Sequence, residues 1–153
     1  MASLRPGAAK ILYGLLFAAA LPAALVAWAF ASRNAIRIAT PHSIPCGIAL
    51  AATGAAIMLT GMLSLRIYGG GLPMNAFPPP RFVGKGVYGL IPHPIYGGFV
   101  MMCGGVAILF GSASGLWLVT PSVALACAAL VLGYEMPDLR QRFGAQASSP
   151  CWA

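Results

Sequence analysis

Four long apolar runs, separated by short polar segments, dominate the chain. They cover about residues 11–31, 44–65, 94–110 and 116–134, and none contains Asp, Glu, Lys or Arg. A helix of about 20 apolar residues spans the ~30 Å hydrocarbon core of a bilayer. The pattern therefore predicts an all-α polytopic membrane protein with about four transmembrane helices. A short Gly/Ser link at 111–115 separates the last two runs, which we expect to form a C-terminal helical hairpin.

The first run has a second interpretation, as a secretory signal peptide. Arg5 and Lys10 precede it, and the tripeptide 29–31 (Ala-Phe-Ala) resembles a cleavage site. Signal-peptide apolar regions are about 7–15 residues long, however, and this run is longer, so we expect a membrane span. Pro22 lies within it; a kink there is tolerated where neighbouring groups satisfy the freed carbonyl.

The second run carries small residues at near-helical spacing. They are Gly47, Ala51, Gly54 and Ala55. Small residues let helix backbones approach closely in a membrane. The pattern serves helix pairing within one chain as readily as between chains, so it leaves the oligomeric state open.

Residues 66–93 differ from the runs on either side. They contain three basic residues, a triple glycine at 69–71 and a triple proline at 78–80. Proline interrupts a helix, which predicts a structured or interfacial loop rather than a span. Long loops without repeats often carry function.

Composition and charge support the membrane interpretation. The chain is 59% hydrophobic and only 7% charged, against roughly 25% charged in soluble domains. Its net charge of +7 comes from basic residues placed singly beside the apolar runs, which argues against a nucleic-acid-binding surface. The four cysteines include no Cys-x-x-Cys pair, so we expect no metal site and no disulfide framework.

The basic residues also predict the orientation. With four spans, the N-terminus, the 66–93 loop and the tail share one side. Seven of the nine Lys and Arg residues lie there, and only Arg33 and Arg37 lie on the other. Basic residues prefer the cytoplasm, so we expect both termini to be cytoplasmic, in a bacterial-type inner membrane, with 66–93 as a cytoplasmic loop.

One motif imitates a nucleotide site. Gly84, Gly86 and Gly89 form Gly-x-Gly-x-x-Gly. The dinucleotide-binding meaning requires a preceding strand, a following helix and an acidic residue about 20 positions further on. The chain offers none of these, so we interpret the motif as a loop.

A more informative group lies at the ends of the last two runs. His93, Pro94 and Tyr96 open the third run, and Glu135 follows the fourth. If these runs form a hairpin, the side chains meet at one membrane face. Ionisable groups at membrane depth are costly and are candidate functional residues. Taken singly, Glu135 could instead pair with Arg140 or Arg142, and His93 could be a simple interface residue before a helix-starting proline.

Two ordered motifs resemble a known family. The first runs from Gly86 to Gly98 (Gly-Val-Tyr-Gly-Leu-Ile-Pro-His-Pro-Ile-Tyr-Gly-Gly), and the second from Tyr134 to Gly144 (Tyr-Glu-Met-Pro-Asp-Leu-Arg-Gln-Arg-Phe-Gly). The pair resembles the integral membrane methyltransferases of the isoprenylcysteine carboxyl methyltransferase and phospholipid methyltransferase group. The resemblance covers a methyltransferase-like core at 84–144, within a single membrane domain at 1–153.

The resemblance implies a function. It implies S-adenosylmethionine at the cytoplasmic face and a membrane-resident acceptor that is a lipid or a lipidated molecule, either isoprenylcysteine-like or phospholipid-like. His93 and Tyr96 would contact the cofactor, together with Pro94 of the same motif. Tyr88 and Gly86 would shape the cofactor loop, and Glu135 would bind a polar group of the cofactor. No residue is assigned a catalytic role.

The chain departs from the family pattern at three places. Pro92 replaces an arginine, Met136 replaces a frequent second glutamate, and the tyrosines that usually follow Phe-Gly are missing after Gly144. These departures leave a second hypothesis open. The chain could be a catalytically inactive membrane scaffold, or a fusion-derived domain, that retains the fold.

Overall fold

The computed structural model describes residues 12–71 and 80–144, and this part of the chain is built from helices and loops without a strand. The predicted all-α class is confirmed. The predictions that involve Arg5, Lys10, Pro78, Pro79 and the tail beyond Gly144 lie outside the described residues. The elements in chain order are η1 (Leu16–Ala20), α2 (Leu21–Ala31), α3 (Ile44–Ser64), η2 (Leu65–Gly69), η3 (Gly86–Gly89), α4 (Pro94–Leu109), η4 (Gly115–Val119), α5 (Thr120–Leu130), η5 (Val131–Glu135) and α6 (Met136–Phe143).

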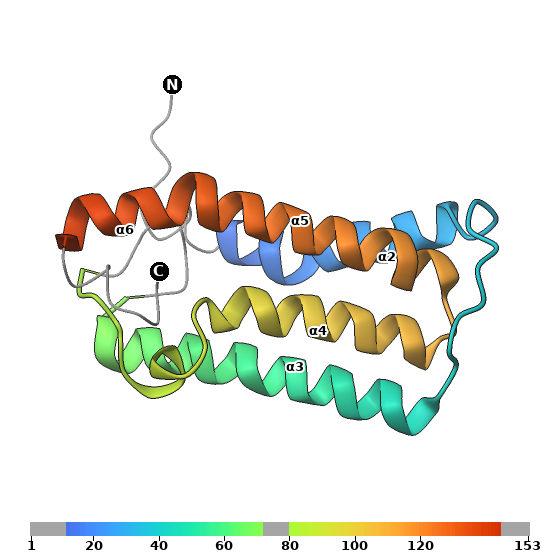
Figure 1. Ribbon diagram of the computed structural model, residues 1–153, viewed down its shortest axis with the longest axis horizontal. Coiled ribbons are helices and arrows are strands. Elements are labelled where there is room, and N and C mark those ends of the chain that lie inside the picture. Colours follow the sequence, from blue (N-terminus) through green and yellow to red (C-terminus); the bar gives the residue numbers. More distant parts are fainter. Residues whose placement is uncertain (1–11, 72–79, 145–153) are drawn as a thin grey trace.

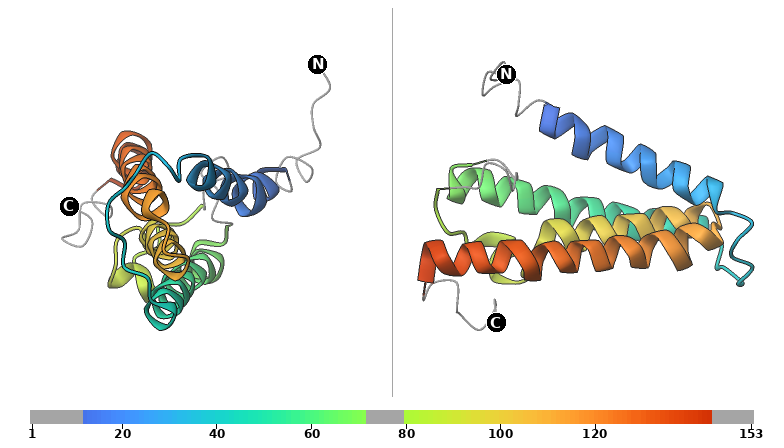
Figure 2. Two further views of the ribbon diagram at one scale, coloured as in Figure 1. Left: turned by 90° about the vertical axis from the view of Figure 1, so that its right-hand side faces the viewer. Right: turned by 90° about the horizontal axis from the view of Figure 1, so that it is seen from above.

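These elements join into four helical rods. Three are long and apolar enough to cross a membrane, at Leu12–Ala31, Ile44–Gly69 and Gly115–Phe143, and the fourth, Pro94–Leu109, is shorter. The rods run side by side, with α4 between α3 and α5 (Figure 1). The described ends of the chain lie toward the same end of the bundle, where the first rod splays away from the others (Figure 2). The molecule is an integral membrane protein of the predicted class.

A seam of glycines holds α3 against α4. On α3 the buried glycines Gly47, Gly54 and Gly61 recur every seven residues, a period that keeps one face toward a neighbouring helix. A Cβ atom on Gly54 would lie 2.6 Å from the Gly98 carbonyl oxygen, and one on Gly98 would lie 2.5 Å from the Gly54 oxygen. The small-residue face of the second run therefore packs within the chain. This close antiparallel contact fixes the start of α4 beside the end of α3.

The first rod is attached differently. It has no buried residue in η1 or α2. Near its end, the carbonyl oxygen of Ala29 accepts a 2.7 Å hydrogen bond from the hydroxyl of Ser114, a residue only 1% exposed. At the same end of the bundle, the Trp117 indole nitrogen donates to the Ala39 carbonyl at 3.4 Å. The first bond fastens the first rod at the end away from its splayed start, and the second holds the loop that follows it.

Two helices extend beyond the apolar runs. The second helix continues to Gly69 and ends at Gly70, whose φ of 68° is left-handed. The fourth passes Tyr134 and continues through α6 to Phe143. The Gly/Ser link is also shorter than its sequence indicates, because the helix has begun by Ala113. Loss of apolar residues marks where lipid contact ends, which is not always where helical hydrogen bonding ends.

Three prolines lie inside the long helices without breaking them. Pro22, Pro121 and Pro137 each follow a wide π-helical turn, η1, η4 and η5 respectively. In each case the residue just before the proline donates its N–H to the carbonyl five residues earlier. Such local π adjustment keeps backbone groups bonded around a proline in a membrane helix. Pro22 is thus accommodated within its own helix.

Candidate functional site

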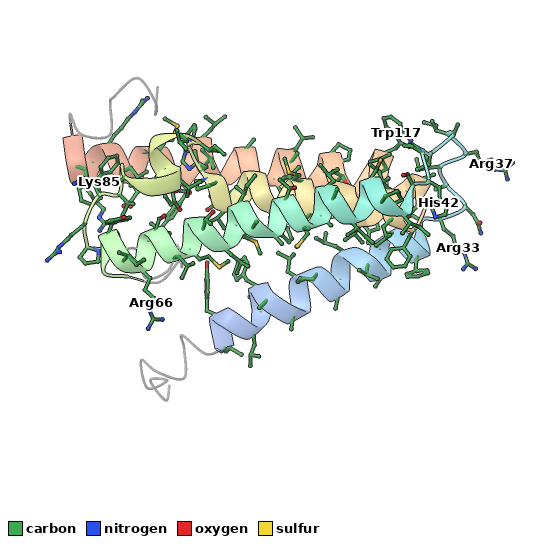
Figure 3. All side chains as sticks on the ribbon, turned by 90° about the horizontal axis from the view of Figure 1, so that it is seen from below. Arg33, Arg37, His42, Arg66, Lys85 and Trp117 are labelled. Atoms are coloured by element: carbon green, nitrogen blue, oxygen red, sulfur yellow. The ribbon has the colours of Figure 1, made fainter. Side chains whose placement is uncertain are left out.

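The predicted site residues gather at one end of the bundle. The segment 80–93 folds across the ends of α3 and α4 and lies beside α6 (Figure 1). In Figure 3, Lys85 and Arg66 lie at this end, whereas Arg33, Arg37, His42 and Trp117 lie at the opposite one. We call the first of these the site end.

Gly86 and Tyr88 seat the 80–93 segment against the helices. Gly86 has a φ of +67°, and a Cβ atom there would lie 2.9 Å from the hydroxyl oxygen of Ser64. Both observations require glycine, which adopts left-handed backbone without a steric penalty. Tyr88, in η3, is only 5% exposed and forms a small core with Val83, against which Leu65 and Leu139 pack. The segment is therefore held from both sides, by the end of the α3 helix and by α6.

His93 has an unusual backbone. Its φ of 55° and ψ of 51° make it the one non-glycine residue with positive φ in the described chain. It lies between Pro92 and Pro94, and a residue before proline normally prefers extended backbone. Strained conformations of this kind cost about 1–3 kcal/mol and concentrate at functional sites. Pro94 follows, almost fully buried, at the first position of α4.

The left-handed turn places the His93 ring opposite Glu135. Its Nδ1 atom lies 3.3 Å from Oε1 of Glu135, and the two side chains are 14% and 24% exposed. Nδ1 donates this hydrogen bond when it carries the ring proton. The imidazole forms no cap bond to the start of α4. The convergence of these two residues across the hairpin therefore agrees with the geometry expected from the sequence.

Two tyrosines complete the group. The Tyr96 ring lies with its centroid 6.2 Å from that of His93, at an interplanar angle of 49°. Burial raises the pKa of Tyr88, and the nearby charges of Glu135 and Tyr96 raise it further. We call His93, Tyr96, Glu135 and Tyr88 the His-Tyr-Glu cluster.

One atom of the cluster has no partner. The second carboxylate oxygen of Glu135, Oε2, is buried and accepts no hydrogen bond from the described residues. The chain has only one other carboxylate side chain, Asp138, which pairs with Arg142 at 3.3 Å. A buried unsatisfied oxygen costs about 1–3 kcal/mol and calls for an explanation such as a bound group. Glu135 thus offers an acceptor to a cationic or hydroxyl-bearing ligand.

Some residues at the site end were not among the candidate site residues identified from the sequence. Ser64 packs under Gly86, and the rings of Phe82 and Phe143 lie 5.6 Å apart, joining the 80–93 segment to α6. Phe143 could have been identified from the sequence, because it belongs to the Phe-Gly pair of the second motif. Nothing in the apolar context of Ser64 distinguished it from a membrane-facing serine.

The glycine motif has the role of a loop. Gly84 precedes η3, Gly86 begins it and Gly89 ends it. No strand precedes it within the described residues, so the structure supports the loop interpretation over a dinucleotide fingerprint.

The sequence matches the phospholipid methyltransferase family over residues 43–146. The chain belongs to the phospholipid methyltransferase family. The match begins at the start of α3 and includes the whole His-Tyr-Glu cluster, but not the first helix. No curated protein and no solved structure shows a significant match. Membership in this family confirms the resemblance found in the two motifs.

The cluster suits the cofactor that this membership implies. S-adenosylmethionine carries an ammonium group, ribose hydroxyls and a sulfonium cation. The unpartnered oxygen of Glu135 fits an ammonium or a hydroxyl group. An aromatic face such as that of Tyr96, which is partly exposed, attracts cations. The residues present therefore fit the polar groups of S-adenosylmethionine.

Proposed function

We propose that this protein transfers a methyl group from S-adenosylmethionine to an acceptor that resides in the membrane. The observation that carries the proposal is the buried, unpartnered Oε2 atom of Glu135, held beside His93 in a chain of the phospholipid methyltransferase family. S-adenosylmethionine supplies a methyl group activated by the adjacent sulfonium.

The residues of the cluster have distinct roles in this proposal. Glu135 binds the amino group or a ribose hydroxyl through Oε2. His93 holds the Glu135 carboxylate through Oε1 and presents its ring to the cofactor, next to Tyr96. Gly86 and Tyr88 shape the loop that closes the site. Aligning donor and acceptor and excluding water are the main requirements of an in-line displacement.

The acceptor is a lipid or a lipidated molecule. The site lies at the end of an apolar bundle, so a headgroup at the membrane surface reaches it without leaving the bilayer. The family favours a phospholipid amine, and an isoprenylcysteine carboxylate is the other candidate. An amine must lose a proton to react, and His93, a residue type suited to general base catalysis, is the group we assign to receive it. A carboxylate acceptor needs no base.

A catalytically silent scaffold is the competing function. It is favoured by the replacement of the family's arginine with Pro92 and of its second glutamate with Met136. A scaffold has no need for a buried carboxylate oxygen without a partner. That oxygen is why we place the enzyme first.

Calorimetry of the purified protein in detergent tests the proposal. Wild type is titrated with S-adenosylmethionine beside His93→Ala, Glu135→Gln and the control Asp138→Asn, whose carboxylate pairs with Arg142 at the surface. We expect both cluster variants to weaken binding at least about tenfold, or 1.4 kcal/mol, and the control to bind as wild type. A folded wild type that binds no cofactor would establish the scaffold instead.

We also propose that the site end faces the cytoplasm of a bacterial-type inner membrane. Among the described residues, five basic residues belong to the segments at this end: Arg66, Arg81, Lys85, Arg140 and Arg142. Arg33 and Arg37 lie at the other end (Figure 3). Two variants, Asn34→Cys and Lys85→Cys, each carry a single cysteine in an otherwise cysteine-free chain. Both are labelled in intact cells with an impermeant maleimide. Labelling at position 34 alone supports the orientation, and labelling at position 85 alone reverses it.

A further inference from the structure

The proline-linked wide turns have one spacing throughout the described chain. Leu16–Ala20 ends two residues before Pro22, Gly115–Val119 two before Pro121, and Val131–Glu135 two before Pro137. In an α-helix a proline ring collides with the carbonyl four residues earlier and lacks the N–H for that bond. A wide turn just before the proline moves that carbonyl away. A fourth wide turn, Leu65–Gly69, ends at the left-handed Gly70 and has no proline after it, so a wide turn can also form without proline. Each proline inside a long helix of the described chain nevertheless has one directly before it.

The last of these turns contains Glu135. Between residues 125 and 135, all side chains are exposed except Cys127, Val131 and Glu135, which are spaced four apart. An α-helix advances about 100° per residue, so each step of four residues overshoots the inner face by roughly 40°. The wide turn takes up one extra residue, and this cancels the drift at Glu135. Glu135 consequently faces His93 instead of turning toward lipid.

The extra residue in this turn also sets which side of α6 faces the site end. Leu139 lies four residues beyond Glu135 and packs against the core formed by Val83 and Tyr88. Loss of the extra residue would rotate everything after the turn by about 100°. Glu135 and Leu139 would both leave the site end together.

We propose that Pro137 is a positioning residue: by imposing the wide turn at Val131–Glu135, it aims the Glu135 carboxylate at His93. Its own ring is exposed, and it acts through the Glu135 side chain. The catalytic consequence rests on the proposed function, but the positioning itself does not.

Cross-linking tests the positioning without any cofactor. The four native cysteines are replaced, and cysteines are introduced by His93→Cys and Glu135→Cys. A short bis-methanethiosulfonate reagent should join them efficiently when Pro137 is present. Adding Pro137→Ala should reduce the yield at least about fivefold. The matched control Pro22→Ala removes a proline with the same type of wide turn from the first helix, which carries neither cysteine, and should leave the yield unchanged.

A rescue variant separates register from a general structural effect. Alanine is a far better helix former than proline, so Pro137→Ala is expected to remain folded and to continue as a regular α-helix. Deleting Gly133 in that background removes the extra residue and should restore the cross-link. Gly133 suits this change because it is exposed and a Cβ atom there would meet nothing within 4 Å. An undiminished yield in Pro137→Ala, or a loss that the deletion does not reverse, would overturn the proposal.

Cofactor affinity then links positioning to function. If wild type binds S-adenosylmethionine, Pro137→Ala should weaken binding at least tenfold, with recovery in the deletion variant and no change in Pro22→Ala. If wild type does not bind it, the proposed function fails, whereas the cross-linking result still decides the role of Pro137.

Discussion

His93 and Glu135 are 42 residues apart in the sequence, yet Nδ1 of one lies 3.3 Å from Oε1 of the other. Each comes from an irregular piece of backbone, a left-handed residue before α4 and the last residue of a wide turn after α5. Two local distortions thus create the one contact on which the candidate site depends.

A double-mutant cycle should detect this contact. His93→Ala and Glu135→Ala, singly and together, are compared by the free energy of unfolding in detergent. Because the pair is charge-assisted and partly buried, we expect a coupling of about 1–3 kcal/mol. Single effects that add to within about 0.5 kcal/mol would show that the two groups do not interact in solution.

Tyr88 should make stability depend on pH in the alkaline range. Burial and the charge of Glu135 raise its pKa, so the folded state keeps a proton that the unfolded chain releases above about pH 10. Stability from this group is complete below that pH and falls as pH rises further. The melting temperature of wild type should therefore decline more steeply between pH 9.5 and 11 than that of Tyr88→Phe. Tyr134→Phe, whose residue is 54% exposed, serves as the control and should follow wild type.

Adjacent glycines in α4 should respond in opposite ways. A Cβ atom on Gly98 would lie 2.5 Å from the Gly54 oxygen, whereas one on Gly97 would meet nothing within 4 Å. Gly98→Ala forces the helices apart and should cost about 1–3 kcal/mol. Gly97→Ala should be neutral or stabilise the helix by up to about 1 kcal/mol. Thermal unfolding in detergent compares the two, and equal effects would contradict close packing at the seam.

Ser114 should anchor the first helix. Its hydroxyl donates to the Ala29 carbonyl at 2.7 Å, and α2 has no buried residue of its own. We expect Ser114→Ala to lower the free energy of unfolding by about 0.5–1.5 kcal/mol. Thr53→Ala removes an exposed hydroxyl bonded within its own helix and should change it by less than about 0.5 kcal/mol. A Ser114 variant as stable as wild type would show that the first helix is held by other means.

Pro92 should be a position where cofactor affinity can be increased. The resemblance places an arginine there, and a guanidinium at this exposed position would give the carboxylate of S-adenosylmethionine a charge-assisted hydrogen bond worth about 1.5–3 kcal/mol. We expect Pro92→Arg to tighten binding by tenfold or more, measured by calorimetry, and Pro92→Gln to have little effect. If both bind as wild type, the cofactor carboxylate is held elsewhere, with Lys85 and Arg81 as the next candidates.

The sequence by itself determined the helical class and the identity of the cluster. Uncharged runs of bilayer length leave no other way to satisfy the backbone in lipid than a helix. Pro94 marked the start of α4, since proline suits the first helical turn. Polar groups are rare and costly in such a chain, which made His93, Tyr96 and Glu135 candidates. Tyr88 became a candidate only through the family resemblance. The family match over 43–146 includes all four positions.

Only the tertiary structure decided how these residues meet. The left-handed backbone of His93 conflicts with its local preference before proline and depends on the packing of Pro94 and the 80–93 segment. The direction in which the Glu135 side chain points depends on one extra residue in a helical turn. The hydrophobic pattern of the sequence does not reveal that residue. The sequence lists which groups can form a site, whereas packing over distances of many residues sets the angles at which they face each other.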